Sequence, residues 1–310
     1  MSKKTNKIIY KFRKFVSKKS IRFKKIYFVL VKLHRFYCFV TAPLHVLPDF
    51  YIIGTQKGGT SSLYDYLITH PSIEPCYTKE PSYFDRYFER GLHWYKVSFP
   101  FKLHKFIKIN FFKKNFLTGE ASVRYLDHPF APQRIKEITP DAKFIILLRN
   151  PISRSFSQYS RVKGNNRENL SFKEAFLNES KRTKDDFKKI YENPLYYADS
   201  YFTYSYFERG LYVDKIKRWM EVFPKEQFLI IQSEEFFKNP SKTYNDVLEF
   251  LGLPSHDLKT YEPIRKQKKS ILKKQTQQKL QNYFKPHNEK LYNFLGKKFD
   301  WDDEWENDEN

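Results

Sequence analysis

The sequence has few cysteines and no long apolar run, and each shortage excludes a class of protein. Its two cysteines, Cys38 and Cys76, supply neither a disulfide framework nor a zinc site. The longest apolar run near the N-terminus, Ile26 to Val31, is far shorter than the roughly 20 residues that a membrane-spanning helix needs. None of the recognised sequence signatures of nucleic-acid-binding domains is present. The 310 residues, of which 40% are apolar, instead predict a globular chain with a substantial core.

The N-terminal end of the chain has no acidic residues, and the C-terminal end has no basic ones. Residues 1–48 hold thirteen lysines and arginines and no acid, whereas residues 300–310 hold seven acids and no base. Of the formal net charge of +22, about +16 therefore belongs to the body between these ends. Such a body is compatible with nucleic acid, an anionic membrane surface, or acidic substrates and cofactors.

We divide the chain into a basic, aromatic arm (1–48), one folded domain (49–301) and an acidic tail (302–310). The arm suits an amphipathic segment on an anionic membrane, but a solvated extension that packs loosely on the domain fits it equally well. A signal-anchor that tolerates Lys32 and Arg35 stays open, while the absence of a clear small-residue cleavage site disfavours a secretory signal.

The stretch from Asp49 to His70 predicts a buried strand, a glycine-containing turn and a helix. An apolar run ends in Gly54, and Leu63, Tyr66 and Leu67 then recur at helical spacing. Such a turn lets backbone N–H groups surround an anion, and the helix N-terminus adds unpaired donors and partial positive charge. We therefore expect a phosphate site here, although an ordinary strand-to-helix turn is the simpler alternative.

The lysine of this loop is displaced from its position in ATP- and GTP-binding loops. There a lysine directly follows the second glycine, whereas here Thr60 follows Gly58-Gly59 and the lysine, Lys57, precedes them. Three hydroxyl residues, Thr60, Ser61 and Ser62, come next. This order suits a ligand with one 5′-phosphate and a transferable group beside it better than a magnesium-bound triphosphate.

Further strands are expected at residues 116–118, 143–148 and 227–231, with helices between them. Strands that alternate with helices predict an α/β fold with a parallel sheet. The polar residues 165–199 show helical periodicity only around residues 172–176, and we expect a surface excursion there.

Two acids and one pair of anion-binding residues are further candidates for the site. Glu80 follows Lys79 shortly after the phosphate loop and is either a general base or a solvated surface acid. Glu120 is either a second active-site acid or the cap of a turn. Arg149, after the strand at 143–148, and Ser157, two turns into the next helix, are expected to converge on one anion.

Together these segments resemble the nucleotide-dependent sulfotransferases, especially the heparan sulfate and carbohydrate branch. The resemblance covers nearly all of the chain from residue 49 to Trp301, and its motifs occur in the family's order. They are GTQKGGTSSL (54–63), KEPSYFD (79–85), GEAS (119–122), LRNP (148–151) with Arg154, Ser157 and Tyr159, RGLY (209–212) with Trp219, and YFKPHNEKLY (283–292).

The resemblance implies a P-loop-like three-layer fold with about five parallel strands, and a donor, 3′-phosphoadenosine 5′-phosphosulfate (PAPS), that leaves as adenosine 3′,5′-bisphosphate (PAP). Lys57, Gly58, Gly59, Thr60, Ser61 and Ser62 match the loop that holds the 5′-phosphosulfate. Arg149 and Ser157 match the pair that binds the 3′-phosphate, and Tyr212 belongs to the same nucleotide site. Lys268 and Lys269 lie where the family has a loop that closes over the nucleotide, although that loop usually contains glycine.

The implied reaction moves a sulfuryl group to a hydroxyl or amine of a glycan, glycolipid or related acceptor. Glu80 matches the family's general base, Lys57 neutralises charge in the transition state, and Glu120 is the next acid to consider. No metal and no nucleic acid are expected. A cytoplasmic or membrane-peripheral location is favoured, with a signal-anchored lumenal enzyme of Golgi type as the alternative.

Three other interpretations remain open at this point. A nucleotide kinase or other P-loop phosphotransferase would need magnesium and a lysine directly after Gly59, where Thr60 stands. A non-enzymatic module that binds acidic glycans or nucleic acid would follow from the charge alone. A membrane-peripheral scaffold would use the N-terminal arm.

Overall fold

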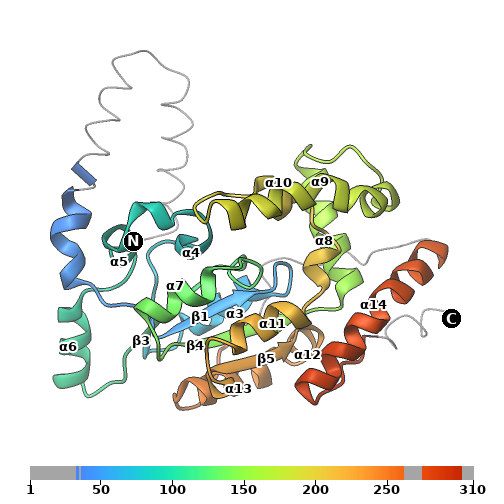
Figure 1. Ribbon diagram of the computed structural model, residues 1–310. Helices are drawn as coiled ribbons and strands as arrows, with labels where there is room; N and C mark the ends of the chain where they lie inside the picture. The colour runs from blue at the N-terminus through green and yellow to red at the C-terminus, as the bar shows by residue number, and fades with distance from the viewer. Residues whose placement is uncertain (1–32, 35, 262–273, 302–310) are drawn as a thin grey trace.

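A sheet of five parallel strands forms the centre of the computed structural model, which describes residues 33–34, 36–261 and 274–301 (Figure 1). The strand order is β2-β3-β1-β4-β5, so the strand that precedes the phosphate loop is central. The predicted α/β fold with about five parallel strands is confirmed. The strands are β1 (Phe50–Gly54), β2 (Ile73–Pro75), β3 (Leu117–Ala121), β4 (Lys143–Leu148) and β5 (Phe228–Gln232).

Helices cover both faces of the sheet, which explains why its central strands are continuous apolar runs. All five residues of β1 are buried, as are all but the first of β4. In Figure 1, α7 (Ala131–Ile138) and α11 (Val213–Met220) lie in front of the sheet. On the other side α3 (Thr60–Leu67), which contacts β1 and β3, packs against α13 (Pro240–Leu251). These layers enclose the main core.

The other helices surround this sandwich or extend from it. Short 3-10 helices stand in the connections at η1 (Ala42–Leu44), η2 (Phe88–Arg90), η3 (Glu208–Gly210) and η4 (Lys225–Gln227). The remaining α-helices are α4 (Tyr83–Arg86), α5 (Leu92–Lys96), α6 (Lys102–Asn110), α8 (Pro151–Gly164), α9 (Phe172–Glu192), α10 (Asp199–Tyr204), α12 (Ser233–Lys238) and α14 (Lys274–Leu295).

Parallel pairing brings the carboxyl ends of the strands to one edge of the sheet. There β1 leads into the phosphate loop, β3 carries Glu120, and β4 leads to Arg149. Ligands of open α/β sheets bind at this edge. The topology therefore gathers three of the sequence-predicted segments at one place.

Two strands differ from the sequence expectation. The expected strand at 116–118 is β3, which runs on to Ala121 and so contains Glu120 rather than ending before it. Strand β2 was missed, because its three residues are too short for an alternating pattern and end in a proline.

The polar stretch 165–199, expected to be a surface excursion with helical periodicity only around residues 172–176, contains the 21-residue helix α9, many of whose side chains are exposed, and α10 begins at its last residue, Asp199. Ser171 and Glu174 form a reciprocal capping box at the start of α9. The buried face of α9 includes Glu179 and Thr183, and these polar side chains hide the apolar period. Glu179 accepts hydrogen bonds from the backbone N–H groups of Phe207 and Glu208 at 2.8 and 2.7 Å.

Most of the N-terminal arm and all of residues 302–310 lie outside the described residues. Within the described part of the arm, residues 36–41 are helical, and the buried His45 and Val46 attach the chain to the domain. His45 Nδ1 lies 2.6 Å from the carbonyl oxygen of Phe99, and Val46 N–H donates to Pro100 at 2.9 Å. Among the described helices, none combines the length and apolar character that a bilayer span requires.

Candidate active site

The loop between β1 and α3 is held tightly against the sheet. Thr55 N–H donates to the carbonyl oxygen of Leu147 at 3.0 Å. A Cβ added to Gly58 would lie only 2.7 Å from that same oxygen, so a side chain does not fit there. Gly59, the N-cap of α3, has φ +95°, a conformation that glycine adopts without strain. The two glycines thus let the chain turn sharply into the helix.

Two buried hydroxyls beside this loop have no hydrogen-bond partner among the described residues. They are Thr55 Oγ1 and Ser233 Oγ, the latter only 3.2 Å from where a Cβ of Gly58 would lie. Buried polar atoms in folded proteins are usually hydrogen-bonded, so an unpartnered pair calls for an explanation. Together with the N-terminus of α3, these hydroxyls fit a phosphate-bearing ligand of the loop.

Arg149 connects the end of β4 to the phosphate loop. Its side chain is buried, and Nη1 donates to the carbonyl oxygen of Lys57 at 3.0 Å. Tyr212 is also buried, and its hydroxyl donates to the carbonyl oxygen of Arg149 at 2.6 Å. Tyr212 therefore braces the backbone of Arg149.

The helix α8 places the other predicted partner of this site, Ser157, half-buried two turns from Arg149. The helix begins where the Asn150 side chain accepts from the N–H groups of Ile152 and Ser153. Arg154 faces the interior, where it donates to the side chain of Gln158 and the carbonyl of Tyr206. Arg154 therefore serves the packing of α8, whereas Ser157 is only partly buried, and its contact with a 3′-phosphate stays a prediction.

The loop that carries Glu80 has an unusual backbone. Glu80 is exposed, with φ +54°, and Ser82 has φ +51°. Lys57 has φ +76°, so three of the five described non-glycine residues with positive φ belong to these two loops. Such conformations cost free energy and persist where the surroundings hold them, often at functional sites.

Glu120 lies beneath this loop in a network of hydroxyl groups. Its carboxylate is 1% exposed and accepts from Tyr95 Oη at 2.5 Å, Ser122 Oγ at 2.6 Å and Tyr125 Oη at 3.1 Å. Burial raises the pKa of Glu120 to about 7, although the three hydroxyls favour its charged form. Glu120 thus faces the core rather than solvent.

The same hydroxyls hold the backbone that follows Glu80. Ser122 Oγ accepts from the N–H of Ser82 at 3.1 Å, and Tyr125 Oη accepts from the N–H of Tyr83 at 3.0 Å. A chain of hydrogen bonds therefore runs from the Glu120 carboxylate to the residues directly after Pro81. Through this chain Glu120 fixes the position of the loop.

Replacing Glu120 with glutamine is expected to change how stability depends on pH. The pKa of this carboxyl rises on folding from 4.5 to about 7, so its favourable contribution is complete below about pH 4.5 and is lost as pH rises through 7. Relative to E120Q, the wild type should therefore lose up to about 3 kcal/mol of unfolding free energy between about pH 5 and pH 8. Urea unfolding of both proteins across this range measures the difference, and parallel pH profiles would contradict it.

Asp85, in α4, is a functional candidate that the sequence reasoning did not single out. Its side chain is buried beside the Glu80 loop, and burial raises its pKa to about 6 while the charge of Arg124 opposes the shift. In the sequence, the one indication of a role for Asp85 was its position at the end of the 79–85 motif. Nothing in the sequence showed that this acid is buried whereas Glu80 is exposed.

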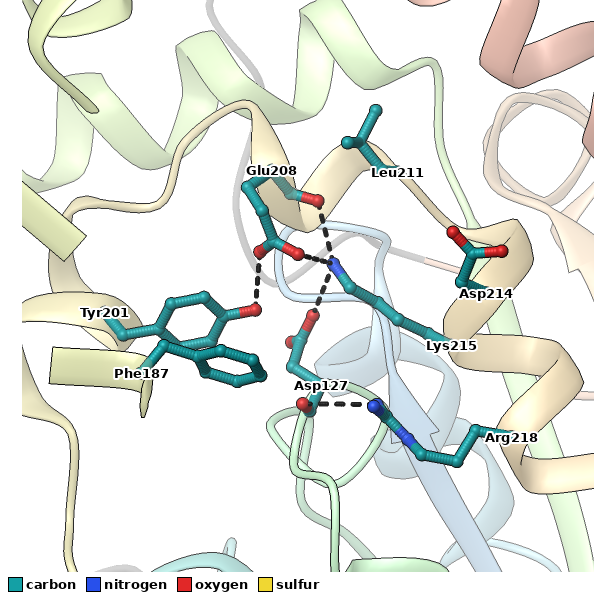
Figure 2. A pocket seen from close by; sticks show the side chains of 8 residues that line it. All are labelled: Asp127, Phe187, Tyr201, Glu208, Leu211, Asp214, Lys215 and Arg218. Atoms are coloured by element: carbon teal, nitrogen blue, oxygen red, sulfur yellow. Dashed lines mark hydrogen bonds and ion pairs between the residues drawn. The ribbon is translucent and has the colours of Figure 1, made fainter. Parts of the chain in front are cut away.

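A second cluster of charged residues surrounds Asp127, which Figure 2 shows with Lys215 and Glu208 close by. Arg209 Nη2 lies 2.7 Å from Asp127, and its Nη1 donates to Gln56 of the loop at 2.7 Å. Lys215 Nζ lies 3.2 Å from Asp127 and 3.3 Å from Glu208. The adjoining pocket of about 140 Å³ is lined by Asp127, Phe187, Tyr201, Glu208, Leu211, Asp214, Lys215 and Arg218. Because these charges neutralise one another, the cluster serves to position Gln56.

Two of the predicted nucleotide-binding residues cannot be placed in the structure. Lys268 and Lys269 lie outside the described residues, so their role in closing over a nucleotide stays a prediction. Within the described ranges, no three His, Cys, Asp or Glu side chains are grouped as a metal site would require.

The fold is an α/β sandwich with a glycine-containing loop at the carboxyl edge of a parallel sheet, the edge at which such folds bind their ligands. A family model described as "Sulfotransferase domain" matches residues 47–309. The chain belongs to this sulfotransferase family and is a PAPS-dependent transferase. Neither a P-loop kinase nor a non-enzymatic binding module is favoured by these similarities.

Individual relatives agree with this family. The chain is 26% identical to the "Membrane-associated sulfotransferase kil1" of Dictyostelium discoideum, over 84% of this chain and 68% of that protein. It is 26% identical to the mouse "Heparan sulfate glucosamine 3-O-sulfotransferase 3B1", over 83% of this chain and 65% of that protein. A sulfotransferase crystal structure from Alicyclobacillus acidocaldarius superimposes with a TM-score of 0.62 at 29% identity, covering 83% of this chain and 99% of that one.

Proposed function

We propose that this protein transfers the sulfuryl group of PAPS to a hydroxyl or amine of a glycan or a glycolipid. The observation that carries the proposal is the loop before α3, where Arg149 donates to the carbonyl oxygen of Lys57 and two buried hydroxyls, Thr55 Oγ1 and Ser233 Oγ, have no partner among the described residues. Support for a glycan acceptor comes from the relatives named for heparan sulfate. The basic body of the chain also suits an acidic polysaccharide.

Two groups of residues would hold the two phosphate-bearing ends of the donor. Lys57, Gly58, Gly59, Thr60, Ser61 and Ser62 would surround the 5′-phosphosulfate, and Arg149 with Ser157 would bind the 3′-phosphate. Bound there, the donor supplies a sulfuryl group on a good leaving group. The release of PAP and the independence from metal remain part of this proposal.

The chain's own residues would then position the acceptor and move its proton. Glu80 removes the proton of the attacking hydroxyl or amine, and Lys57 neutralises the charge that develops on the leaving phosphate. Glu120 acts as a positioning residue, because its hydroxyl network fixes the backbone beyond Pro81. The rigid loops hold the reacting groups in line, which lowers the entropic part of the barrier.

The transfer is tested by incubating the full chain with sulfate-labelled PAPS and a panel of acceptors. The panel contains desulfated heparan, other desulfated glycans, glycolipids and small alcohols. We expect label on a glycan or glycolipid and little on the small alcohols. Transfer to none of them, together with no calorimetric binding of PAP, would refute the proposal.

Substitutions at the proposed 3′-phosphate site are expected to weaken PAP binding to different degrees. R149A should weaken PAP binding by about 10- to 100-fold, because it removes a charge-assisted, planar pair of donors. R149K should recover only part of this affinity, since lysine keeps the charge but not the fork. S157A should cost several-fold. Isothermal titration with PAP measures these values, and R161A, which changes an exposed arginine farther along α8, is the control. An R149A affinity equal to that of R161A would contradict the assignment.

Peripheral membrane contact through residues 1–48 stays a prediction from the sequence, because most of that arm lies outside the described residues. No role for nucleic acid is proposed.

A further inference from the structure

Helix α6 turns lysines toward the domain and apolar side chains toward solvent, the reverse of an ordinary surface helix. Its less exposed side chains are lysines, which the domain binds through acids. Lys108 Nζ donates to Glu74 Oε1 at 2.6 Å, and Lys105 Nζ lies 3.8 Å from Asp49. Both ammonium groups also lie over the ring of Phe116, at 5.8 and 5.5 Å from its centroid. Polar contacts therefore attach α6 to the domain, where apolar packing is usual.

The apolar side chains of α6 and of the turn after it point to solvent instead. Leu103 is 66% exposed, Phe106 54%, Phe111 72% and Phe112 66%. Single exposed apolar residues are common on soluble proteins, but several large ones in one short segment mark an interaction surface.

A neighbouring segment continues this surface. Phe36, Phe39 and Val40, in the helical residues 36–41, are each more than half exposed. The chain that follows them is joined to the start of α6 by an isolated bridge between His45 and Phe101, whose rings lie 4.1 Å apart. Figure 1 shows the two segments at one end of the molecule, with residues 36–41 in blue and α6 below them.

The charge around this surface indicates what covers it. Residues 101–115 contain five lysines and no acid. Lys105 and Lys108 are used to attach the helix, and Lys102, Lys113 and Lys114 are exposed beside the phenylalanines. Aromatic side chains bordered by lysines are the combination that binds anionic membrane interfaces. A partner protein with a neutral apolar groove would leave these three lysines without a counter-charge.

We propose that α6 and the Phe111–Phe112 turn dock on an anionic lipid surface. The phenylalanines enter the boundary between headgroups and acyl chains, and Lys102, Lys113 and Lys114 meet the lipid phosphates. This inference depends neither on the proposed acceptor nor on residues 1–32 of the N-terminal arm. It implies that the enzyme works next to a membrane, within reach of lipid-linked or membrane-bound acceptors.

An environment-sensitive fluorophore on the full chain tests this contact directly. The dye is attached at F111C, and the native cysteines, Cys38 and Cys76, are buried. With vesicles that contain phosphatidylserine, we expect blue-shifted, stronger emission that reverses as salt is raised. Vesicles of phosphatidylcholine alone should have little effect. The matched control is the same dye at L177C, an equally exposed apolar position on α9, which should not respond.

Substitutions on this surface test whether it, rather than residues 1–32, is responsible for vesicle binding. F111S/F112S and K102Q/K113Q/K114Q should each lower partitioning into anionic vesicles by about tenfold or more, while sulfate transfer to a soluble acceptor stays unchanged. If the chain co-sediments with vesicles but the dye at position 111 stays in water, another segment binds and the proposal is wrong. It is equally wrong if the dye is already in an apolar environment without vesicles, because the chain itself or a protein partner then covers the surface. Failure to bind anionic vesicles also overturns it.

Discussion

Replacing Lys57 with alanine is expected to lower the turnover number by about 10²- to 10³-fold while PAP affinity changes much less. The loop backbone and the Arg149 contact to the carbonyl of Lys57 do not depend on the lysine side chain. The ground-state ligand therefore keeps most of its contacts. What is lost is the positive charge beside the leaving phosphate, which matters most in the transition state.

Turnover measured with labelled donor and PAP affinity measured by calorimetric titration together test whether K57A lowers the first much more than the second. K57R, which keeps the charge on a different group, should lie between the wild type and K57A. K242A, a change of an exposed lysine that pairs with Asp246 far along the chain, serves as the control for net charge. Wild-type turnover and wild-type affinity in K57A would refute the role assigned to Lys57.

Replacing Glu80 with glutamine is expected to lower turnover by about 10²- to 10⁴-fold, because glutamine cannot accept the acceptor's proton. PAP affinity should be unchanged, since Glu80 belongs to the acceptor side of the proposed site. The exposed position of Glu80 leaves the stability of the fold nearly the same. E89Q, which changes an exposed acid in η2, is the matched control.

Comparing E80Q with E120Q distinguishes the proposed general base, Glu80, from the positioning residue, Glu120. E80Q should lose turnover at every pH without changing the pH profile of stability, whereas E120Q should change that profile. If E80Q kept wild-type turnover, Glu80 would not be the general base. Thermal unfolding measured beside the kinetics distinguishes a loss of chemistry from a loss of structure.

The sequence was sufficient where structure follows from local pattern. Strands β1 and β4 are continuous apolar runs, and their burial on both faces follows from a parallel sheet. The displaced Lys57 and the hydroxyls after Gly59 also pointed to the sulfotransferase family, which the family match confirms, because a phosphate-loop motif consists of consecutive residues. Strand β2 was missed because three residues carry no period, and only the first residues of helix α9 were recognised as helical because Glu179 and Thr183 interrupt its buried face.

Only the tertiary structure showed how the loop first singled out in the sequence is held in place. The sequence by itself predicted its chemistry, with Lys57 ahead of two glycines. Its supports come from far along the chain: Gln56 is bound by Arg209, 153 positions away, and the Lys57 carbonyl is bound by Arg149, 92 positions away. Such partners leave no local pattern, because their proximity arises only when the sheet assembles. For the same reason, the sequence could not show that α6 turns its lysines inward and its phenylalanines outward.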